Sequence, residues 1–396
     1  MPNQHPIRVL IAGVSTRAAA ESAARAGFAV TAIDAFGDLD QHPSVRGLSL
    51  GHNFTARAAA LAAQSIECDA VVYLSNFENH PKAISAFAEG RALWGNSPEI
   101  VRRVRDPLIL AEALQARGFS TPAVRLKLDT TYVGSYVVSG FSRTVNEWLV
   151  KPLASGGGQR IQLWDRATSL PRGRYLQEFI DGPAGSVVFV AAGGRAVPLA
   201  VSRQLVGEQA FGARGYQYCG NILTAAGDGQ VPHDETLVDA ASALAQAVVD
   251  EFALVGINGV DFIARSGSPC AIEVNPRWCA SMELVERACG LSVFGAHASA
   301  CTSGKLPDFD LAAAQRGVDA VGKAVVYAQR AVTVGDTQTW LANDHDIRDI
   351  PRPGEQISVG SPVCTVFATG RDATTCHAAL VRRAARVYAQ LDAWYA

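Results

Sequence analysis

Residues 256–286 read GINGVDFIARSGSPCAIEVNPRWCASMELVE, and this stretch decides how the rest of the chain is interpreted. It predicts two short strands, GVDFIA and PCAIEVN, joined by a Ser-Gly-Ser turn and followed by a helix from about Ser281. Side chains alternate along a strand, so Glu273 and Asn275 share one face of the second strand, and Asp261 on the neighbouring strand can face them. Two carboxylates and an amide oxygen suit a Mg²⁺ ion that already holds nucleotide phosphates. An amphipathic surface hairpin with solvated acids explains the same pattern, and the hairpin alone does not decide between them.

The composition excludes several classes of protein. The chain has 396 residues, of which 48% are hydrophobic and 18% charged, with a net charge of −2. This length predicts roughly two to three domains, and this charge balance excludes a dominant polybasic surface for nucleic acid. The eight cysteines include no CxxC pair and no His–Cys cluster at zinc spacing, so reduced structural thiols and a cytoplasmic location are expected. The apolar run near the N-terminus is short and no run approaches the ~20 residues that span a bilayer, so we expect neither a secretory signal nor a membrane partner.

Residues 7–100 alternate between strand and helix signals. Such alternation predicts a parallel sheet covered by helices. Gly13 ends the first strand and Asp34 the second, which raises the alternative of a dinucleotide site. The turn GVSTRA lacks the spaced glycines that let a backbone approach pyrophosphate, so this alternative is disfavoured. We expect instead an open α/β domain whose loops at the carboxyl ends of the strands, residues 15–17 and 75–78, face a ligand.

A helical segment and a small strand-rich unit follow. Ser97 is a suitable N-cap, and Asp106-Pro107 predicts a break into two helices. Residues 123–182 then predict several strands, and between two of them lies KPLASGGGQR, which begins at Lys151. A glycine triplet exposes backbone N–H groups to phosphate oxygens, and Lys151 can add a point charge. A flexible hairpin turn is the alternative for this loop taken alone.

The remaining segments lead up to the opening hairpin and away from it. LQEFIDG ends an extended run at Gly182, and the next residues predict an antiparallel hairpin with Gly193-Gly194 at its tip. Residues 234–254 predict a long amphipathic helix that runs directly into the hairpin of Asp261. Residues 306–320 are expected to be a connector.

The order of these motifs resembles the ATP-grasp superfamily over roughly residues 5–370. VKPLASGGG, LQEFIDG and GVDF…AIEVNPR each occur at the place that the family pattern expects. The resemblance implies an α/β and α+β ATP-grasp fold with an N-terminal open parallel α/β (pre-ATP-grasp) domain. It implies four parts: an N-terminal domain (1–96), a lid subdomain with its leading helix (97–182), a subdomain with the metal site (183–305), and a β-rich extension with a terminal helix (306–396).

The resemblance also implies which residues hold the nucleotide. Lys151 would contact the α-phosphate and the adenine side. The mobile loop over the β- and γ-phosphates would consist of Ser155, Gly156, Gly157 and Gly158. The adenine hinge would consist of Glu178, Phe179 and Ile180.

The same resemblance places the metal and the substrate end of the site. Asp261, Glu273 and Asn275 would hold Mg²⁺, with Mn²⁺ as an alternative ion. Arg277 would face the transferred phosphoryl group or the substrate carboxylate, and Arg203 is a second cationic candidate.

Three features depart from the family pattern. Arg105, or Arg103, stands where a lysine usually contacts ATP. Ala184 stands near the usual position of a ribose-binding acid, which leaves Asp181 as the nearest candidate. The tail from Gly322 is similar to the carboxyl-terminal strands of biotin-carboxylase-like members.

The implied activity is an ATP-dependent, ADP-forming carboxylate–amine (amino-acid) ligation through an acylphosphate, with small-molecule carboxylate and amine substrates. A weaker similarity to the tyramine-glutamate ligase-like group suggests a role in cofactor biosynthesis, and the substrate would lie between the loops of the first domain and residues 203–221. A biotin-carboxylase-like, carboxyphosphate-forming enzyme and a non-catalytic ATP-binding protein are the alternatives. The resemblance leaves the assembly open, with a homodimer as one alternative. Cys279, His297 and His345 are expected to be structural or surface residues.

Overall fold

The N-terminal domain, residues 5–96, is a parallel sheet with helices on both faces, as predicted. The computed structural model describes residues 5–126, 147–165, 169–223, 235–315, 319–343 and 346–394. In order across the sheet, the strands are β3 (Arg46–Ser49), β2 (Ala29–Asp34), β1 (Arg8–Ala12), β4 (Ala70–Tyr73) and β5 (Ala92–Leu93). The helices are α1 (Arg17–Arg25), α2 (Ala56–Ala63) and α3 (Pro81–Phe87), with short 3-10 turns at Gly51–Asn53 and Phe77–Asn79.

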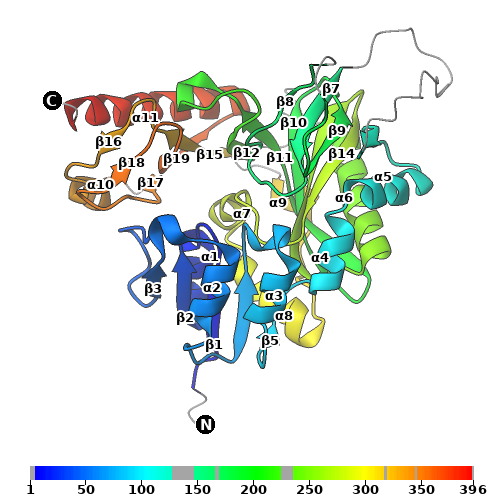
Figure 1. The fold of residues 1–396 in the computed structure, drawn as a ribbon, viewed down its shortest axis with the longest axis horizontal. Coiled ribbons are helices and arrows are strands. Elements are labelled where there is room, and N and C mark those ends of the chain that lie inside the picture. Colours follow the sequence, from blue (N-terminus) through cyan, green and yellow to red (C-terminus); the bar gives the residue numbers. More distant parts are fainter. Residues whose placement is uncertain are drawn as a thin grey trace.

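Alternation along β1 explains why both faces of this sheet are covered. Val9 and Ile11 belong to the core cluster that contains α1, whereas Leu10 belongs to the cluster that contains α2 and α3. Strands buried on both faces are typical of parallel sheets. The carboxyl ends of β1, β2 and β4 therefore meet at one edge, which faces the rest of the molecule (Figure 1).

Two short helices connect this domain to a small antiparallel sheet. They are α4 (Pro98–Val104) and α5 (Pro107–Ala116). Ser97 Oγ accepts the N–H of Ile100 at 3.4 Å, and Asp106 Oδ1 accepts the N–H of Leu108 at 2.9 Å, so each helix has its own N-cap and the predicted break is confirmed.

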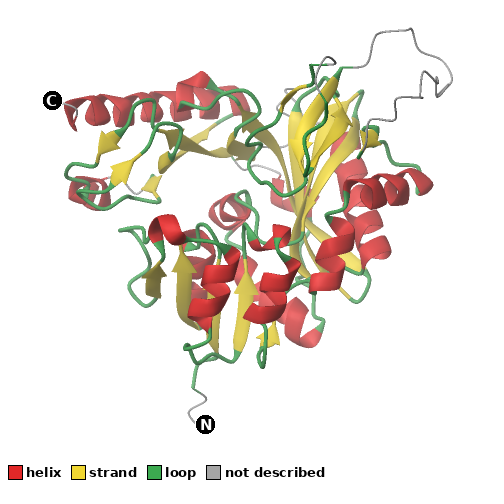
Figure 2. Cartoon of the chain, viewed as in Figure 1, coloured by secondary structure: helices red, strands yellow, loops and turns green. Residues whose placement is uncertain are grey.

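The small sheet, called the lid sheet here, covers one end of the molecule (Figure 2). In order across it, the strands are β6 (Val124–Arg125), β9 (Arg174–Glu178), β7 (Trp148–Pro152) and β8 (Gln162–Leu163). All three pairings are antiparallel.

The largest sheet has eight strands and joins segments that lie far apart in the sequence. In order across it, the strands are β14 (Ser268–Asn275), β13 (Gly256–Arg265), β10 (Ala184–Ala192), β11 (Arg195–Val206), β12 (Tyr218–Leu223), β15 (Ala320–Tyr327), β19 (Pro362–Gly370) and β17 (Ile347–Arg348). Gly193 and Gly194 form the turn between β10 and β11, as predicted. Because β12 pairs with β15, the sheet is continuous across the expected boundary between residues 305 and 306.

Helices cover both faces of this large sheet. The remaining helices are α6 (Glu235–Phe252), α7 (Met282–Cys289), α8 (Val293–Ser303), α9 (Leu311–Gln315), α10 (Gln338–Asn343) and α11 (Ala373–Trp394). Helix α6 packs against β10, β11 and β13, α8 packs against α1 of the N-terminal domain, and α11 packs along β15 and β19. The strands β16 (Val332–Thr333) and β18 (Gln356–Ile357) form a separate pair, and a 3-10 turn spans Gln209–Phe211. None of the helices in the described residues has the length and hydropathy needed to cross a membrane.

Candidate functional site

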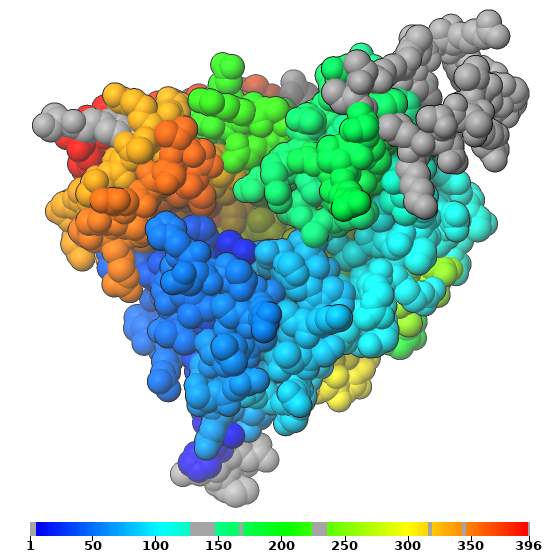
Figure 3. Space-filling view, in the orientation of Figure 1, coloured from blue at the N-terminus to red at the C-terminus, as the bar shows by residue number. Residues whose placement is uncertain are grey.

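A single large cavity collects nearly all of the predicted site residues. Its volume is about 1370 Å³, and its walls come from the N-terminal loops, the lid sheet and the large sheet. Pockets for one small ligand usually measure about 300–1,000 Å³, so this cavity has room for a nucleotide together with a second substrate. Figure 3 shows the corresponding recess between the blue N-terminal residues and the green and orange residues above them.

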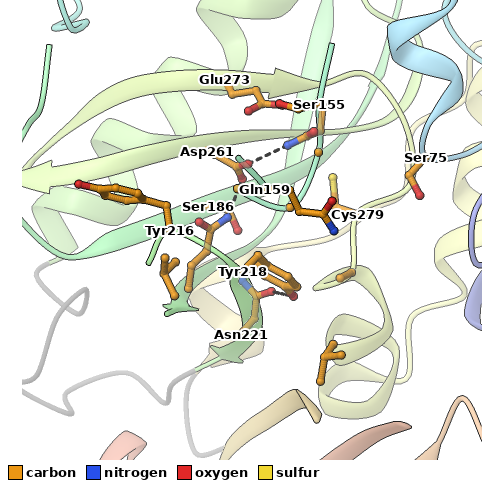
Figure 4. Close-up of a pocket in the computed structure, with 18 of the residues that line it drawn as sticks. Ser75, Ser155, Gln159, Ser186, Tyr216, Tyr218, Asn221, Asp261, Glu273 and Cys279 are labelled. Carbon is orange, nitrogen blue, oxygen red and sulfur yellow. Dashed lines mark hydrogen bonds between the residues drawn. The ribbon is translucent and has the colours of Figure 1, made fainter. Parts of the chain in front are cut away.

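The three predicted metal ligands meet at the hairpin β13–β14. Asp261 is the cross-strand partner of Glu273, and Figure 4 labels both side chains. Asn275 Nδ2 donates to Asp261 Oδ2 at 2.9 Å. The register shifts between Asp261 and Phe262, which leaves Ile272 as an extra residue in β14. A bulge of this kind re-aims the neighbouring side chain, and Glu273, which follows it, lines the cavity.

The two carboxylates differ in their ionisation. Burial and the neighbouring charge of Glu273 raise the pKa of Asp261 to about 6. Burial also opposes the ionisation of Glu273, but the cations of Arg105 and Lys151 outweigh it and lower the pKa of Glu273. The charge of Arg277 and the hydrogen bonds from Asn275 and Gln204, the latter 2.7 Å from Asp261 Oδ1, act in the opposite direction but do not outweigh the burial of Asp261.

This donor set fits a Mg²⁺ ion that carries nucleotide phosphates. No three His, Cys, Asp or Glu side chains gather as a metal cluster in the part of the chain that the structure describes. The candidate protein ligands are two carboxylates, Asp261 and Glu273, and the amide oxygen of Asn275. Mg²⁺ commonly takes only one or two protein carboxylates and completes its shell with phosphates and water. A bound cation would also relieve the repulsion that raises the pKa of Asp261.

Arg105 connects three parts of the molecule. Its guanidinium forms an ion pair with Glu273, and its Nη2 donates to Asn79 Oδ1 at 3.2 Å and to the Ser155 carbonyl at 3.3 Å. Arg105 itself is not among the residues that line the cavity. Its present partners are protein groups, so a direct contact with ATP stays a prediction.

The glycine loop is docked against strand β12. Tyr218 donates its N–H to the Gly157 carbonyl at 3.0 Å. Gly158 has a φ of 70° and approaches the chain so closely that a Cβ atom would lie 1.8 Å from the Tyr216 carbonyl oxygen. On its other side the loop contacts the N-terminal domain, where Asn79 Nδ2 donates to the Ser155 carbonyl at 3.3 Å. Ser155 and the three glycines all line the cavity, as the phosphate-loop prediction requires.

Lys151 lies at the end of β7 and is only 5% exposed. Its Nζ donates to Gln177 Oε1 at 3.0 Å and lies 6.0 Å from the centre of the Tyr175 ring. Lys151 and Gln177 both line the cavity. A buried ammonium with one fixed acceptor retains donors for a phosphate oxygen.

The predicted hinge also lines the cavity, through Glu178, Phe179, Ile180 and Asp181. The Glu178 carboxylate accepts the N–H of Ala123 at 3.1 Å, and Phe179 donates its N–H to the Glu147 carbonyl at 2.9 Å. The N–H of Phe179 is therefore used inside the lid sheet. Ile180 donates its N–H to no described backbone carbonyl, which leaves it for an adenine base.

The two cationic candidates have different surroundings. Arg277 Nη2 lies 2.6 Å from Oε1 of Glu78, a fully buried residue of the N-terminal domain, and 3.2 Å from Asn275 Oδ1. Arg203, on β11, lines the cavity and has no ion-pair or side-chain hydrogen-bond partner among the described residues. Arg203 is therefore the freer of the two to bind an anionic group.

The N-terminal loops face the cavity only in part. Ser15 and Asn76 line it, as expected. Thr16 does not, because it is 1% exposed and its Oγ1 donates to Asp34 Oδ2 at 2.6 Å. Arg17 lines the cavity from a fully buried position. The Asp34 carboxylate accepts this internal hydrogen bond. It is therefore not free to bind a ribose, as the acid of a dinucleotide site does.

The predictions for the structural side chains agree with their surroundings where they are described. Cys279 Sγ donates to the Arg277 carbonyl at 3.4 Å, and burial raises its pKa to about 12. His297 is buried and accepts the N–H of Ile257 at 3.1 Å, and burial lowers its pKa to about 4. His345 lies outside the described residues.

Several residues of the site were missed by sequence reasoning. Gln204 and Gln177 hold Asp261 and Lys151, and Glu78 pairs with Arg277. Gln177 is adjacent to the predicted hinge and Glu78 lies within a predicted ligand-facing loop, so position was a usable signal for both. Nothing in the local sequence of Gln204 indicates that it approaches the metal strands.

Comparisons with known proteins agree with this geometry. Residues 104–281 match the family model of the ATP-grasp domain. No curated protein sequence gives a match.

The matches to solved structures cover nearly the whole chain. The L-amino acid ligase of Bacillus licheniformis is similar with a TM-score of 0.68 at 16% identity, over 97% of this chain and 98% of the ligase. The biotin carboxylase domain of Hydrogenobacter thermophilus 2-oxoglutarate carboxylase, in complex with MgADP and bicarbonate, gives 0.69 at 14% identity, over 93% and 87%. N5-carboxyaminoimidazole ribonucleotide synthetase of Thermotoga maritima gives 0.65 at 15% identity, over 96% and 98%. These matches confirm the predicted fold.

Proposed function

The chain belongs to the ATP-grasp superfamily, and from this premise we propose that it is an ATP-dependent, ADP-forming carboxylate–amine ligase that works through an acylphosphate. One observation carries the proposal. The acidic hairpin, the lysine with its glycine loop, the hinge and two arginines all open onto one cavity with room for more than a nucleotide.

The adenine base and the phosphates of a nucleotide each have candidate partners among the residues that line this cavity. The N–H of Ile180 and the apolar walls beside it suit an adenine base. Lys151 and the backbone of Gly156 and Gly157 suit phosphate oxygens, because they present positive charge and N–H groups without bulky side chains. Mg²⁺ held by the acidic hairpin would neutralise the charge of the β- and γ-phosphates.

The proposed reaction has two steps. An oxygen of the substrate carboxylate forms a bond to the γ-phosphorus while the bond to ADP breaks, which yields an acylphosphate. The nitrogen of an amine then forms a bond to the acyl carbon, inorganic phosphate leaves, and the amine nitrogen gives up a proton. Phosphoryl transfer depends mostly on positioning and on charge stabilisation, which Lys151, Arg203 and Arg277 are placed to supply.

The experiment that tests this function is a screen of ADP release. The full chain with Mg²⁺ and ATP is assayed with carboxylic acids, singly and with amines or amino acids, and separately with bicarbonate. Turnover that requires both an acid and an amine supports the proposal. ADP release that needs bicarbonate and no amine contradicts it.

A variant of the metal strand tests the site itself. Glu273→Ala should abolish turnover, because it removes one of the two carboxylates of the proposed metal site. Since this change also leaves Arg105 without its partner, Glu273→Gln is the matched variant that keeps the shape. Full turnover of either folded variant at saturating Mg²⁺ would show that the metal site is wrongly assigned.

A carboxyphosphate-forming enzyme is the second candidate. It is favoured by the similarity to a biotin carboxylase domain in complex with MgADP and bicarbonate, and the bicarbonate arm of the screen tests it. A non-catalytic ATP-binding role is supported less well, since it does not need the complete set of Asp261, Glu273 and Asn275.

A further inference from the structure

The end of the cavity formed by the N-terminal loops holds an unusual group of buried charges. Arg17 begins α1, Asp38 follows β2, and Asp349 follows β17, and all three line the cavity. Glu283 of α7 and Lys323 of β15 complete the group. These residues come from five separate elements, so the fold itself assembles them.

The cations of this group are already matched by acids. Arg17 Nη1 lies 2.6 Å from Glu283 Oε1, and Arg17 Nε lies 2.9 Å from Asp349 Oδ1. Lys323 Nζ lies 2.7 Å from the other oxygen of Glu283. Asp40 is a further buried acid, 3.7 Å from Arg17. Glu21, 3.2 Å from Arg17 Nη1, and Arg348, 4.0 Å from Asp40, flank the group. With Asp38 included, the acids of the group and its flanks outnumber the cations.

Asp38 differs from the other acids, because no ion pair or side-chain hydrogen bond joins it to any residue that the structure describes. It is 5% exposed, and its Oδ2 is buried without a hydrogen bond to any described residue. Burial, together with the charges of Asp349, Asp34 and Asp40, raises its pKa well above the usual range. A buried polar oxygen without a hydrogen-bond partner is destabilising, so a ligand that donates N–H groups to it is bound more favourably.

A second polar atom beside this end of the cavity is also free. Arg17 Nη2 is buried and has no hydrogen-bond partner in the described part of the chain. Phe36 and Pro351, each two residues from an acid of the group, also line the cavity. The surroundings therefore combine an excess of negative charge with apolar walls.

We infer that this end of the cavity binds the amine substrate, a primary amine with an apolar body, whose ammonium group donates to Asp38. The inference rests on the proposed function, because it assigns the acceptor of the ligation. The negative charge of this group supports the inference, because the same acids would repel an anionic substrate. Arg17 Nη2 provides a donor for an amine that also has a carboxylate.

The test is a binding measurement, independent of turnover. Calorimetric titration of the full chain, with Mg²⁺ and a non-hydrolysable ATP analogue, compares 2-phenylethylamine, L-phenylalanine and 3-phenylpropionate. We expect the amine to bind and the acid without an amino group to bind at least tenfold more weakly. Equal binding of 3-phenylpropionate, or no binding of either amine, would overturn the inference.

Two variants locate the site. Asp38→Asn keeps the shape and should weaken amine binding at least tenfold while the affinity for the ATP analogue changes less than twofold. Glu208→Gln is the matched control, because Glu208 lines the same cavity but is paired with His377 at 2.6 Å, and amine binding should be unchanged. Amine affinity within twofold of the parent in Asp38→Asn would refute the assignment. Asp38→Asn replaces a buried carboxyl group, whose ionisation is already disfavoured, by an amide of the same shape, so we expect it to fold, and unchanged nucleotide binding verifies this.

The two proposals fail separately. If the amine binds at Asp38 but no amine stimulates ADP release, the ligase proposal fails and the binding site stands. If amines stimulate ADP release and Asp38→Asn has normal amine affinity and normal KM for the amine, the ligase proposal stands and the acceptor site lies elsewhere.

Discussion

Lys151 is the cation that we propose to bind the phosphates at the nucleotide end of the site. Its ammonium is buried and has Gln177 as a fixed acceptor. We expect Lys151→Ala to raise the KM for ATP at least tenfold, since a hydrogen bond to a charged group contributes about 1.5–3 kcal/mol. Steady-state kinetics or nucleotide titration measures this effect. Lys82→Ala, at an exposed lysine of α3, is the control, and an unchanged affinity in Lys151→Ala would remove Lys151 from the site.

Asp261 predicts a pH dependence of metal binding. A carboxylate must be deprotonated to bind a cation, and the pKa of Asp261 is raised to about 6. Below this pH a proton occupies the site, so the affinity for Mn²⁺ should fall as the pH falls, by up to tenfold per unit. Above it the affinity should be flat, because the pKa of Glu273 is lowered and that residue stays ionised.

Paramagnetic resonance of bound Mn²⁺, between about pH 5 and pH 8 and without nucleotide, measures this dependence. Asp261→Asn should bind more weakly and should lose the dependence. An affinity that is constant through pH 6 in the parent protein would contradict the assignment of Asp261 as a ligand.

For single residues, the sequence was informative about contacts within one strand and with the strand next to it. Alternation in β14 and the neighbouring β13 was enough to bring Asp261, Glu273 and Asn275 together. It was not enough to predict that Arg105 pairs with Glu273 or that Glu78 pairs with Arg277, because those contacts join residues more than 160 positions apart. Such pairs depend on how whole domains pack, which no local pattern records.

The glycine loop is the element whose shape can be tested most sharply. Gly158 tolerates no Cβ, since that atom would lie 1.8 Å from the Tyr216 carbonyl, whereas Gly156 has open space at the same position. Gly158→Ala should therefore displace the loop from β12 and lower kcat/KM for ATP at least tenfold. Gly156→Ala is the matched control and should have a much smaller effect. Equal activity of the two variants would show that docking of the loop is not needed for function.

At the scale of elements, the order of strands and helices was predictable and their docking was not. The break between two helices at Asp106-Pro107, the Gly193-Gly194 turn and the parallel N-terminal sheet follow from local signals. The glycine triplet predicts contact with phosphate, but it does not indicate whether the loop is docked against another strand. Its contact with β12 depends on Tyr216 and Tyr218, which lie about sixty residues further along the chain.

The whole molecule is held together by contacts between the N-terminal domain and the metal-site strands. Tyr73 donates its hydroxyl to the Pro276 carbonyl at 3.0 Å, and Asn96 donates to Asn258 Oδ1 at 2.8 Å. The ion pair of Glu78 with Arg277 lies in the same interface. The site proposed for nucleotide, metal and substrate therefore lies where the domains are joined, so the stability of the interface and the geometry of that site should be linked.

This linkage predicts a double effect of Glu78→Gln. Removing one partner of a buried ion pair costs about 3–5 kcal/mol because the other charge stays buried without compensation. We expect a single cooperative unfolding transition in the parent protein and, in Glu78→Gln, an earlier transition that separates the N-terminal domain from the rest. Turnover should also fall at least tenfold, since Arg277 loses the contact that positions it.

Scanning calorimetry and steady-state kinetics measure the two effects, and Glu89→Gln, at an exposed glutamate, is the control. A saturating concentration of Mg²⁺ with an ATP analogue should shift the early transition upward by mass action, since the nucleotide binds only the assembled site. If the early transition moves without any loss of turnover, Glu78 stabilises the interface and does not position Arg277. If neither quantity changes, the domains are held together by the apolar contacts of α1 with α8, and the site does not depend on this ion pair.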